Sequence, residues 1–249
     1  MRAVRPLVAH EQARWTLSLY PTAGEAGGAF VSARRHRWVA GGAGADPDRA
    51  RAEAARRARA KVRRYCAANL LNRFGTLTYG PPRCTDPAQL RDDLGGFFRS
   101  LRTALGGSPL PYVWVPEWHK DGEHLHAHFA LARFVPRDLI ASTWDRGFID
   151  IRLRRGVPVG ASPRDEARGA AKYLAKYVGK TFDHPHLFGR HRYDVAQGFQ
   201  PQAQRLTGRT SGEVLDQACE VMGAAPERAW SSAEVEDWDR PPAVWFSWA

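Results

Sequence analysis

The chain has 249 residues, of which 43% are hydrophobic, so it is long enough to bury the core of one large domain or two small ones. Its formal net charge is +11, and lysine fills only five of the 37 basic positions, so arginine fills the other 32. Three widely spaced cysteines argue against a disulfide framework, and the absence of a run of about twenty apolar residues argues against a membrane span.

The excess of arginine indicates a nucleic-acid partner, because the guanidinium group binds phosphate through paired hydrogen bonds and stacks on bases. A composition set by genomic base content is the alternative. Residues 1–20 lack the continuous apolar segment of a secretory signal peptide. Together with the unpaired cysteines, this predicts a cytoplasmic protein without a membrane partner.

A short hairpin and a basic helix are predicted in the first 68 residues. Trp15–Tyr20 and Ala29–Trp38 are expected to pair around a glycine-rich turn. Asp46-Pro47 opens a helix that extends to about residue 68, because aspartate is a good N-cap and proline suits the first turn. Arginines surround this helix among alanines, which fits either a helix along a DNA backbone or a solvated surface helix. On the first interpretation, the candidate DNA contacts are Arg56, Arg59 and Arg63.

The next segment is predicted to form a strand and a helix. Leu70–Tyr79 is rich in aromatic and β-branched residues, which favours a strand. Thr76 and Thr78 then share one face, with their hydroxyls within reach of a DNA backbone. From Asp86-Pro87 to residue 105, apolar residues recur at helical spacing.

Polar and apolar residues alternate strictly from Glu123 to Leu131, which predicts a half-buried strand with one apolar face and one open imidazole face. Pro111–His119 is the preceding strand, and the Asp-Gly pair between them is typical of a tight turn. The resulting hairpin brings Glu117 beside His126 or His128. One carboxylate and two imidazoles, without cysteine nearby, favour Mg²⁺ or Mn²⁺ over structural zinc. A solvated, histidine-rich edge strand is the alternative.

A second group of candidate residues follows on a predicted helix, Glu166–Val178, which is expected to end at Gly179. Residues four apart share one face of a helix, and this places two phenols and two ammonium groups on one stripe. The stripe consists of Tyr173, Lys176, Tyr177 and Lys180. The alternative is a helix whose tyrosines pack inward while its lysines extend to solvent.

The order of elements indicates the fold class. A helix to about Trp144 and a strand at Phe148–Leu153 separate the histidine strand from the tyrosine helix. From residue 70 the order is strand, helix, strand, strand, helix, strand, helix, which predicts an α+β fold with a central antiparallel sheet and helices on one face. Further on, Ser211–Met222 predicts a helix, and the tryptophans of the tail either stack on bases or fill a small core.

Three motifs in this chain resemble those of the HUH endonucleases, specifically the rolling-circle replication initiator (Rep) proteins of plasmids and phages. His126-Ala127-His128 is similar to the family's histidine motif. Tyr173-Leu174-Ala175-Lys176-Tyr177-Val178-Gly179-Lys180 is similar to the doubled Tyr-x-x-Lys motif of its two-tyrosine members. Phe74–Tyr79 is similar to its first motif, a strand with a Thr-Leu-Thr core. The resemblance covers residues 69–181.

This resemblance implies a ferredoxin-like or RRM-like sheet and an enzyme that nicks and rejoins single-stranded DNA at a replication origin through a 5′-phosphotyrosine. It implies that His126, His128 and Glu117 hold a divalent metal, Mg²⁺ or Mn²⁺. By the family's pattern, Tyr177 is the nucleophile and Tyr173 is the second one.

The resemblance also suggests roles for neighbouring residues and partners. Lys176 and Lys180 are expected to favour the phenolate or to pair with phosphate, and His124 to contact DNA or to support the metal ligands. Expected partners are single-stranded or hairpin origin DNA and the host DNA polymerase and helicase, in a bacterial cell that carries the plasmid or phage. The predicted organisation is a basic extension over 1–68, a catalytic domain over 69–182, and an arginine- and tryptophan-rich extension over 183–249. An HUH relaxase, a single-strand transposase and a non-catalytic DNA-binding protein are the alternatives.

Overall fold

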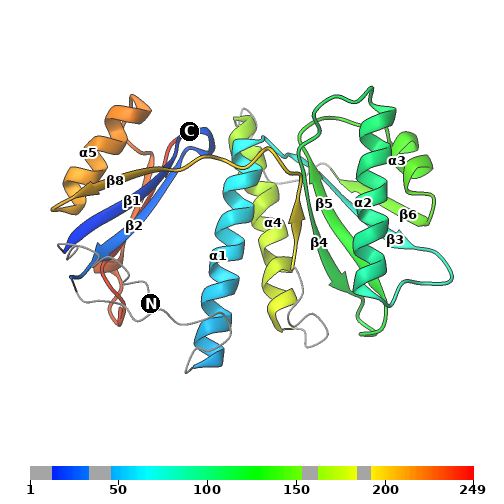
Figure 1. Cartoon of the computed structure of the whole chain (residues 1–249), viewed down its shortest axis with the longest axis horizontal. Coiled ribbons are helices and arrows are strands. Elements are labelled where there is room, and N and C mark those ends of the chain that lie inside the picture. The colour runs from blue at the N-terminus through cyan, green and yellow to red at the C-terminus, as the bar shows by residue number, and fades with distance from the viewer. Residues whose placement is uncertain (1–12, 34–45, 153–161, 184–191) are drawn as a thin grey trace, which may run out of the picture. The chain divides into compact units, whose positions relative to one another are not determined.

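The computed structural model describes residues 13–33, 46–152, 162–183 and 192–249 (Figure 1). The chain divides into two compact units, one within residues 44–201 and one that joins residues before 44 to residues after 201. This division differs from the three segments outlined from the sequence. The arginine-rich helix lies in the same unit as the three motifs, and the two ends of the chain share a sheet.

The unit within residues 44–201 is built on a five-stranded antiparallel sheet in the order β6-β3-β5-β4-β7. From β3 to α4, the elements follow the order that the sequence predicts. The elements of this unit are α1 (Pro47–Ala68), β3 (Arg73–Tyr79), α2 (Pro87–Ala104), β4 (Tyr112–Trp118), β5 (Leu125–Leu131), α3 (Arg137–Trp144), β6 (Gly147–Arg152), α4 (Pro163–Asp183) and β7 (Asp194–Val195).

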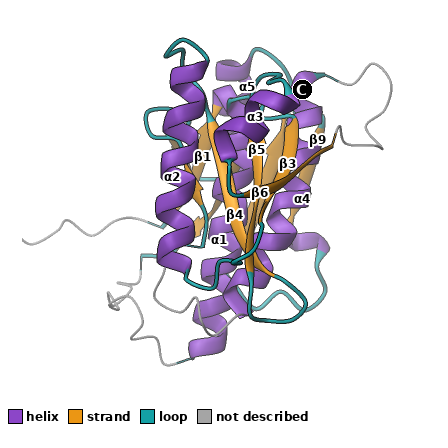
Figure 2. Ribbon diagram, turned by 90° about the vertical axis from the view of Figure 1, so that its right-hand side faces the viewer, coloured by secondary structure: helices purple, strands orange, loops and turns teal. Residues whose placement is uncertain are grey.

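This sheet carries a core on each face, because successive side chains of a strand point in opposite directions. On one face, α2 and α3 pack over side chains that include Leu77, Phe129 and Ile149. On the other face, α1 and α4 pack over Phe74 and Val115. Figures 1 and 2 show the two pairs of helices on either side of the strands. The predicted α+β fold with a central antiparallel sheet is confirmed, and helices cover both faces of this sheet rather than one.

Strand β5 is buried along its whole length, which corrects the prediction of a half-buried strand with an open histidine face. His126 is 9% exposed and His128 is 5% exposed. The apolar face packs under α2 as the alternation predicts, but the ring of Tyr177 on α4 stacks on His128 from the other side of the sheet. The pattern within β5 cannot indicate this cover, because α4 follows much later in the chain.

Helix α4 is longer than predicted at both ends and does not stop at Gly179. Ser162 caps its first turn, since the Ser162 hydroxyl accepts a hydrogen bond from the Asp165 backbone N–H at 3.2 Å. A Cβ at position 179 would lie 3.2 Å from the Arg59 guanidinium, so the small residue allows α1 and α4 to approach closely. The glycine therefore serves packing inside the helix and not termination.

Helix α1 has the predicted bounds, but it is amphipathic and not basic all round. Val62, Tyr65 and Cys66 are buried in one core with Leu174 and Val178 of α4. This packing rules out a helix that is solvated on every side. The buried positions of this helix carry no arginine, so its arginines lie on the remaining faces.

Gly75 on β3 lies opposite Phe129 on β5 and is a point of very close packing. A Cβ at this position would lie 2.5 Å from the Phe129 ring, which is buried against Phe97 and Phe98. We expect Gly75→Ala to lower the free energy of unfolding by about 1–3 kcal/mol, as overpacking of a core does. Chemical denaturation measures the change. Gly96→Ala is the control, because a Cβ there meets no atom closer than 4.0 Å and alanine favours a helix. Wild-type stability for Gly75→Ala would contradict the packing argument.

The second unit is a five-stranded antiparallel sheet in the order β8-β1-β2-β10-β9 with one long helix. Its sheet pairs strands from both ends of the chain. The elements are β1 (Arg14–Tyr20), the 3-10 helix η1 (Pro21–Ala23), β2 (Glu25–Val31), β8 (Gln204–Gly208), α5 (Ser211–Met222), β9 (Arg228–Ser231), the 3-10 helix η3 (Ser232–Glu234) and β10 (Ala243–Ser247).

The predicted N-terminal hairpin is present, but its turn lies elsewhere. The strands are joined through η1, and Gly24 follows in the left-handed region with φ 59°. The glycines that were assigned to the turn lie inside β2, where a Cβ on Gly28 would lie 2.1 Å from the Thr16 carbonyl oxygen. Glycine is therefore needed there for close strand approach and not for the turn. Residues 34–38 of the predicted second strand lie outside the described residues.

The helix predicted at Ser211–Met222 is confirmed as α5. Phe246 and Trp248 are buried with Leu17 and Leu19 in one core, so the small-core interpretation holds for these two aromatic residues. None of the helices in the described part of the chain combines the length and the apolar composition that crossing a bilayer requires.

Candidate metal centre and tyrosine pair

Glu117, His126 and His128 converge on one face of the β4–β5 hairpin. The hairpin register places Glu117 opposite His126, and Val115 opposite His128. Glu117 Oε2 lies 3.1 Å from His126 Nε2 and 2.7 Å from His128 Nε2. The two imidazole nitrogens are 3.2 Å apart. The structure thus brings together the three side chains that the sequence singled out.

The geometry of this group suits a divalent cation. One ligand atom from each residue lies within 4.8 Å of the others. Two ligands that bind one ion at about 2.1 Å and at right angles are about 3 Å apart, which is close to the separations seen here. The donors are one carboxylate oxygen and two imidazole nitrogens, and none of the three residues is exposed. The group can hold a metal ion.

Glu117 is held in its ionised form by its neighbours. Burial alone would raise the pKa of this carboxyl group, but hydrogen bonds with His126, His128 and Lys180 outweigh burial and keep the pKa well below its usual range. The second carboxylate oxygen, Oε1, accepts a hydrogen bond from Lys180 Nζ at 2.5 Å. One oxygen therefore faces the imidazoles and the other faces an ammonium group, which fixes the orientation of the carboxylate.

His128 is oriented from both of its ring nitrogens. Nε2 faces Glu117, and Nδ1 lies 3.0 Å from the Thr76 hydroxyl oxygen, as the supporting groups of metal-binding histidines often do. The Phe74 ring is stacked on His128 at 5.6 Å between centroids. Burial lowers the pKa of His128, and the hydrogen bond with Glu117 opposes this only in part. The neutral imidazole that a metal requires is therefore favoured.

Two phenols of α4 lie beside these histidines. The Tyr177 ring is stacked on His128 with centroids 3.8 Å apart, and Tyr177 is 8% exposed. The Tyr177 hydroxyl donates a hydrogen bond to the Tyr173 hydroxyl oxygen at 2.5 Å. The Tyr173 ring meets Phe74 edge-on at 4.6 Å between centroids. A pair of adjacent hydroxyl groups thus borders the candidate metal centre.

The two lysines of the helical stripe occupy different environments. Lys180 forms an ion pair with Glu117, and its Nζ lies 5.2 Å from the centroid of the Tyr177 ring. Lys176 is exposed and makes no ion pair or hydrogen bond with any described residue. Of the two, Lys180 is therefore placed to act on the carboxylate and the phenol together.

His124 does not join the group of possible metal ligands. It lies in the turn before β5, where its Nδ1 is 2.8 Å from Asp121 Oδ2. The histidine pair that faces Glu117 is His126 and His128, and not His124 with His126. A contact of His124 with DNA stays a prediction.

The other residues assigned to DNA are spread over two elements. Thr76 and Thr78 are half-buried on β3, and the Thr76 hydroxyl is engaged with His128. On α1, Arg56 is exposed and forms an ion pair at 2.8 Å with a glutamate one turn earlier. Arg59 is exposed beside α4, and Arg63 is half-buried. Their role in DNA binding is untested by this geometry.

His119 and Phe74 belong to the site, although the sequence suggested no role for either. The His119 and His126 ring centroids are 4.4 Å apart. A cavity of about 350 Å³ opens beside them and is lined in part by Glu117 and Lys180. His119 follows Glu117 by two residues, so strand periodicity alone could have placed both on one face.

The comparison with protein families concerns the segment that carries this site. Residues 72–182 match the family model of the replication-associated proteins called ORF2 and gene 2 protein. The matched segment contains the possible metal ligands and both tyrosines, and it covers less than half of the 249 residues. No curated protein and no solved structure matches the chain. The family match is consistent with a replication-associated protein of the rolling-circle type.

The affinity for Mn²⁺ should depend on pH through His128. Because its pKa lies below the ordinary value of 6.5, the ring stays neutral to a lower pH than a free imidazole does. We expect the affinity to be constant from pH 8 to about pH 7 and to fall only as the pH drops below about 6.5, where protons compete for the ring. Calorimetric Mn²⁺ titrations at several pH values measure this. An affinity that falls with a midpoint above 6.5, or that rises in acid, would contradict the assignment of His128 as a ligand.

Proposed function

We propose that this protein is an HUH-type, replication-associated endonuclease that nicks and rejoins single-stranded DNA at a replication origin. The observation that carries the proposal is the stacking of Tyr177 on His128, which puts a nucleophile against a Glu-His-His group. The family match over residues 72–182 supports it independently. Each motif by itself would be weak support, because short motifs recur in unrelated proteins.

The tyrosine pair supplies the nucleophile. In the cleavage step, a phenol oxygen bonds to the scissile phosphorus, and the bond from phosphorus to the 3′ oxygen breaks. The phenol gives up its proton and the leaving oxygen takes one up, so the products are a 5′-phosphotyrosine and a free 3′-OH that a polymerase extends. Rejoining reverses these bonds and needs no ATP. Because Tyr173 and Tyr177 are adjacent, one phenol can act while the other remains linked to DNA.

Lys180 and Thr76 assist from fixed positions. The Lys180 ammonium group contacts Glu117 and lies over the Tyr177 ring, so its charge favours both a phenolate and a bound phosphate. Thr76 holds the His128 ring through Nδ1 and keeps Nε2 directed at the carboxylate. These contacts orient the reacting groups before DNA arrives.

Glu117, His126 and His128 would hold Mg²⁺ or Mn²⁺, since a hard oxygen and two imidazoles suit these ions. When bound, the ion supplies Lewis-acid polarisation of a non-bridging phosphate oxygen. The cavity of about 350 Å³ next to Glu117 and Lys180 gives a phosphate access to this face of the hairpin.

A strand-specific labelling experiment tests the proposal. Single-stranded origin oligonucleotides carry a label at either the 3′ or the 5′ end and are incubated with the protein and Mn²⁺. We expect the 3′-labelled fragment to migrate with the protein on a denaturing gel, because it carries the 5′ phosphate that joins tyrosine. The 5′-labelled fragment should be released and should be extendable by a polymerase.

A chelator is the control, and it should remove the adduct. Attachment of the 5′-labelled fragment would contradict the chemistry, because it would require a bond to a 3′ phosphate. Tight DNA binding without any adduct, on every origin strand tested, would leave a non-catalytic DNA-binding protein as the better description.

A further inference from the structure

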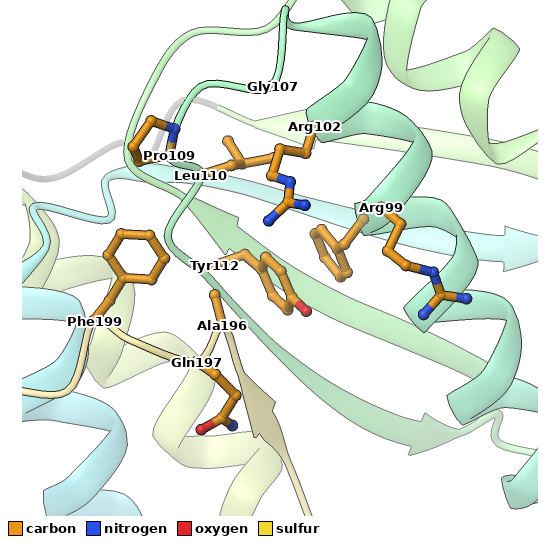
Figure 3. A pocket seen from close by; sticks show the side chains of 10 residues that line it. Arg99, Arg102, Gly107, Pro109, Leu110, Tyr112, Ala196, Gln197 and Phe199 are labelled. Atoms are coloured by element: carbon orange, nitrogen blue, oxygen red, sulfur yellow. The ribbon is translucent and has the colours of Figure 1, made fainter.

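A second cavity in the unit within residues 44–201 has a volume of about 430 Å³ (Figure 3). It lies between the end of α2, the loop that leads into β4, and the segment after β7. The side chains that matter for its chemistry are Phe98, Arg99, Arg102, Tyr112, Gln197 and Phe199. Its volume is within the roughly 300–1,000 Å³ of typical small-molecule sites.

This cavity is on the opposite face of the sheet from the candidate metal centre. Tyr112 packs against the core under α2, whereas its neighbour Val113 packs against the core under α4. Side chains alternate along β4, so Glu117 projects to the same side as Val113. The cavity therefore shares no side chain with the Glu-His-His group or the tyrosine pair.

Flat aromatic rings form two of its walls. The Tyr112 ring is stacked on Phe98 with centroids 3.7 Å apart and an angle of 5° between the planes, which holds the tyrosine rigidly. Phe199 lies on the other side of the opening (Figure 3). Gln197 adds an amide, a group that donates and accepts hydrogen bonds. Such walls fit a planar heterocycle with polar edges.

Positive charge borders the same opening. Arg99 and Arg102 are exposed, lie one turn apart on α2, and form no ion pair with any described acidic residue. Both guanidinium groups interact electrostatically with the Tyr112 hydroxyl. Asp194 acts on the same hydroxyl with the opposite sign, but its carboxylate is 3.2 Å from Arg91 and is neutralised by it. The balance at this edge favours an anion.

We propose that this cavity binds one nucleotide of a single-stranded DNA, with its base against Tyr112 and Phe199 and its phosphate at Arg99 and Arg102. Aromatic stacking combined with unpaired guanidinium groups is how proteins bind single strands without reading their sequence. The net charge of +11 adds a general attraction for the strand. This binding goes beyond strand cleavage, since none of the residues that would cut DNA takes part in it.

The charges are tested by fluorescence anisotropy with a short labelled oligodeoxythymidine in the presence of a chelator, so that no strand is cut. We expect Arg99→Ala/Arg102→Ala to weaken binding and to reduce the slope of log affinity against log salt by about 1.4, which corresponds to two phosphate contacts on a single strand. Arg205→Ala/Arg209→Ala removes two exposed arginines of the other unit and is the matched control. Equal losses in both double variants would overturn the proposal.

The aromatic wall is tested at Phe199, which is half-buried. Phe199→Leu keeps an apolar side chain but removes the ring and should weaken oligonucleotide binding about tenfold, whereas Phe199→Tyr should bind like the wild type. Thermal unfolding checks that both variants fold. A photo-crosslink from iododeoxyuridine should map to the peptides that contain Tyr112 or Phe199.

The source of the nucleotide is tested by competition. Thymidine monophosphate should compete far less well than the oligonucleotide, because it offers one phosphate and no neighbouring contacts. Competition by the monophosphate at the same concentration as the strand would overturn the proposal in favour of a free-nucleotide site. These measurements are independent of cleavage, so a protein that forms no phosphotyrosine can still satisfy them, and an active nuclease can still fail them.

Discussion

Glu117→Gln should abolish strong Mn²⁺ binding and slow the formation of the DNA adduct by about a hundredfold or more. Glutamine keeps nearly the same shape but removes the single carboxylate of the Glu-His-His group, which leaves two neutral imidazoles as ligands. The substitution also removes the negative partner of Lys180. A loss of several kcal/mol of transition-state stabilisation corresponds to the expected rate change. Calorimetry with Mn²⁺ and the rate of adduct formation measure the two effects.

The matched control is Glu123→Gln, which neutralises an exposed carboxylate in the turn of the same hairpin. It should bind Mn²⁺ and form the adduct like the wild type. Thermal unfolding separates a loss of ligation from a loss of fold. Wild-type Mn²⁺ affinity in Glu117→Gln would remove Glu117 from the set of ligands and would leave only the histidines as candidates.

The candidate site was largely accessible from the sequence because its geometry is local. His126 and His128 share a face by strand periodicity, and the short turn fixes the hairpin register that returns Glu117 to them. Tyr173 and Tyr177 share a face by helix periodicity. Each of these relations spans only a few residues, so a pattern rule is enough to find it.

The cover over the histidines was not accessible in the same way. Whether β5 is open or buried depends on α4, and the contact between Tyr177 and His128 joins residues far apart in the chain. The same holds for Gly179, whose meaning is set by Arg59 of α1 and not by its own neighbours. A local rule interpreted this glycine as a helix stop, and tertiary packing determined otherwise.

The division into units shows the same limit at a larger scale. β1 pairs with β8, and β2 pairs with β10, so the two ends of the chain form one sheet. Composition suggested two separate extensions, because the ends share no motif that would indicate pairing. Strand pairing between distant segments depends on the complementarity of whole sheets, which a single sequence does not display.

The tyrosine pair leads to the second large effect. Tyr177→Phe/Tyr173→Phe should form no covalent adduct with single-stranded DNA, because no phenol oxygen remains beside the Glu-His-His group. Phenylalanine keeps the ring that stacks on His128, so the packing of α4 should persist. The labelled-strand gel measures the adduct, and Mn²⁺ titration should show near-wild-type affinity. A double variant that still forms the adduct would assign the nucleophile to another residue.

The single variants separate the roles of the two hydroxyl groups. Tyr177 is the more buried and donates its hydrogen bond to Tyr173, so each phenol can stabilise the charge on the other when that one ionises. We therefore expect Tyr177→Phe to slow the adduct by about a hundredfold or more and Tyr173→Phe to slow it less. Tyr193→Phe, which removes a half-buried phenol outside the pair, is the control and should leave the rate unchanged. If the two single variants showed the opposite order, Tyr173 would be the first nucleophile and Tyr177 its supporting donor, which the direction of the hydrogen bond between them also permits.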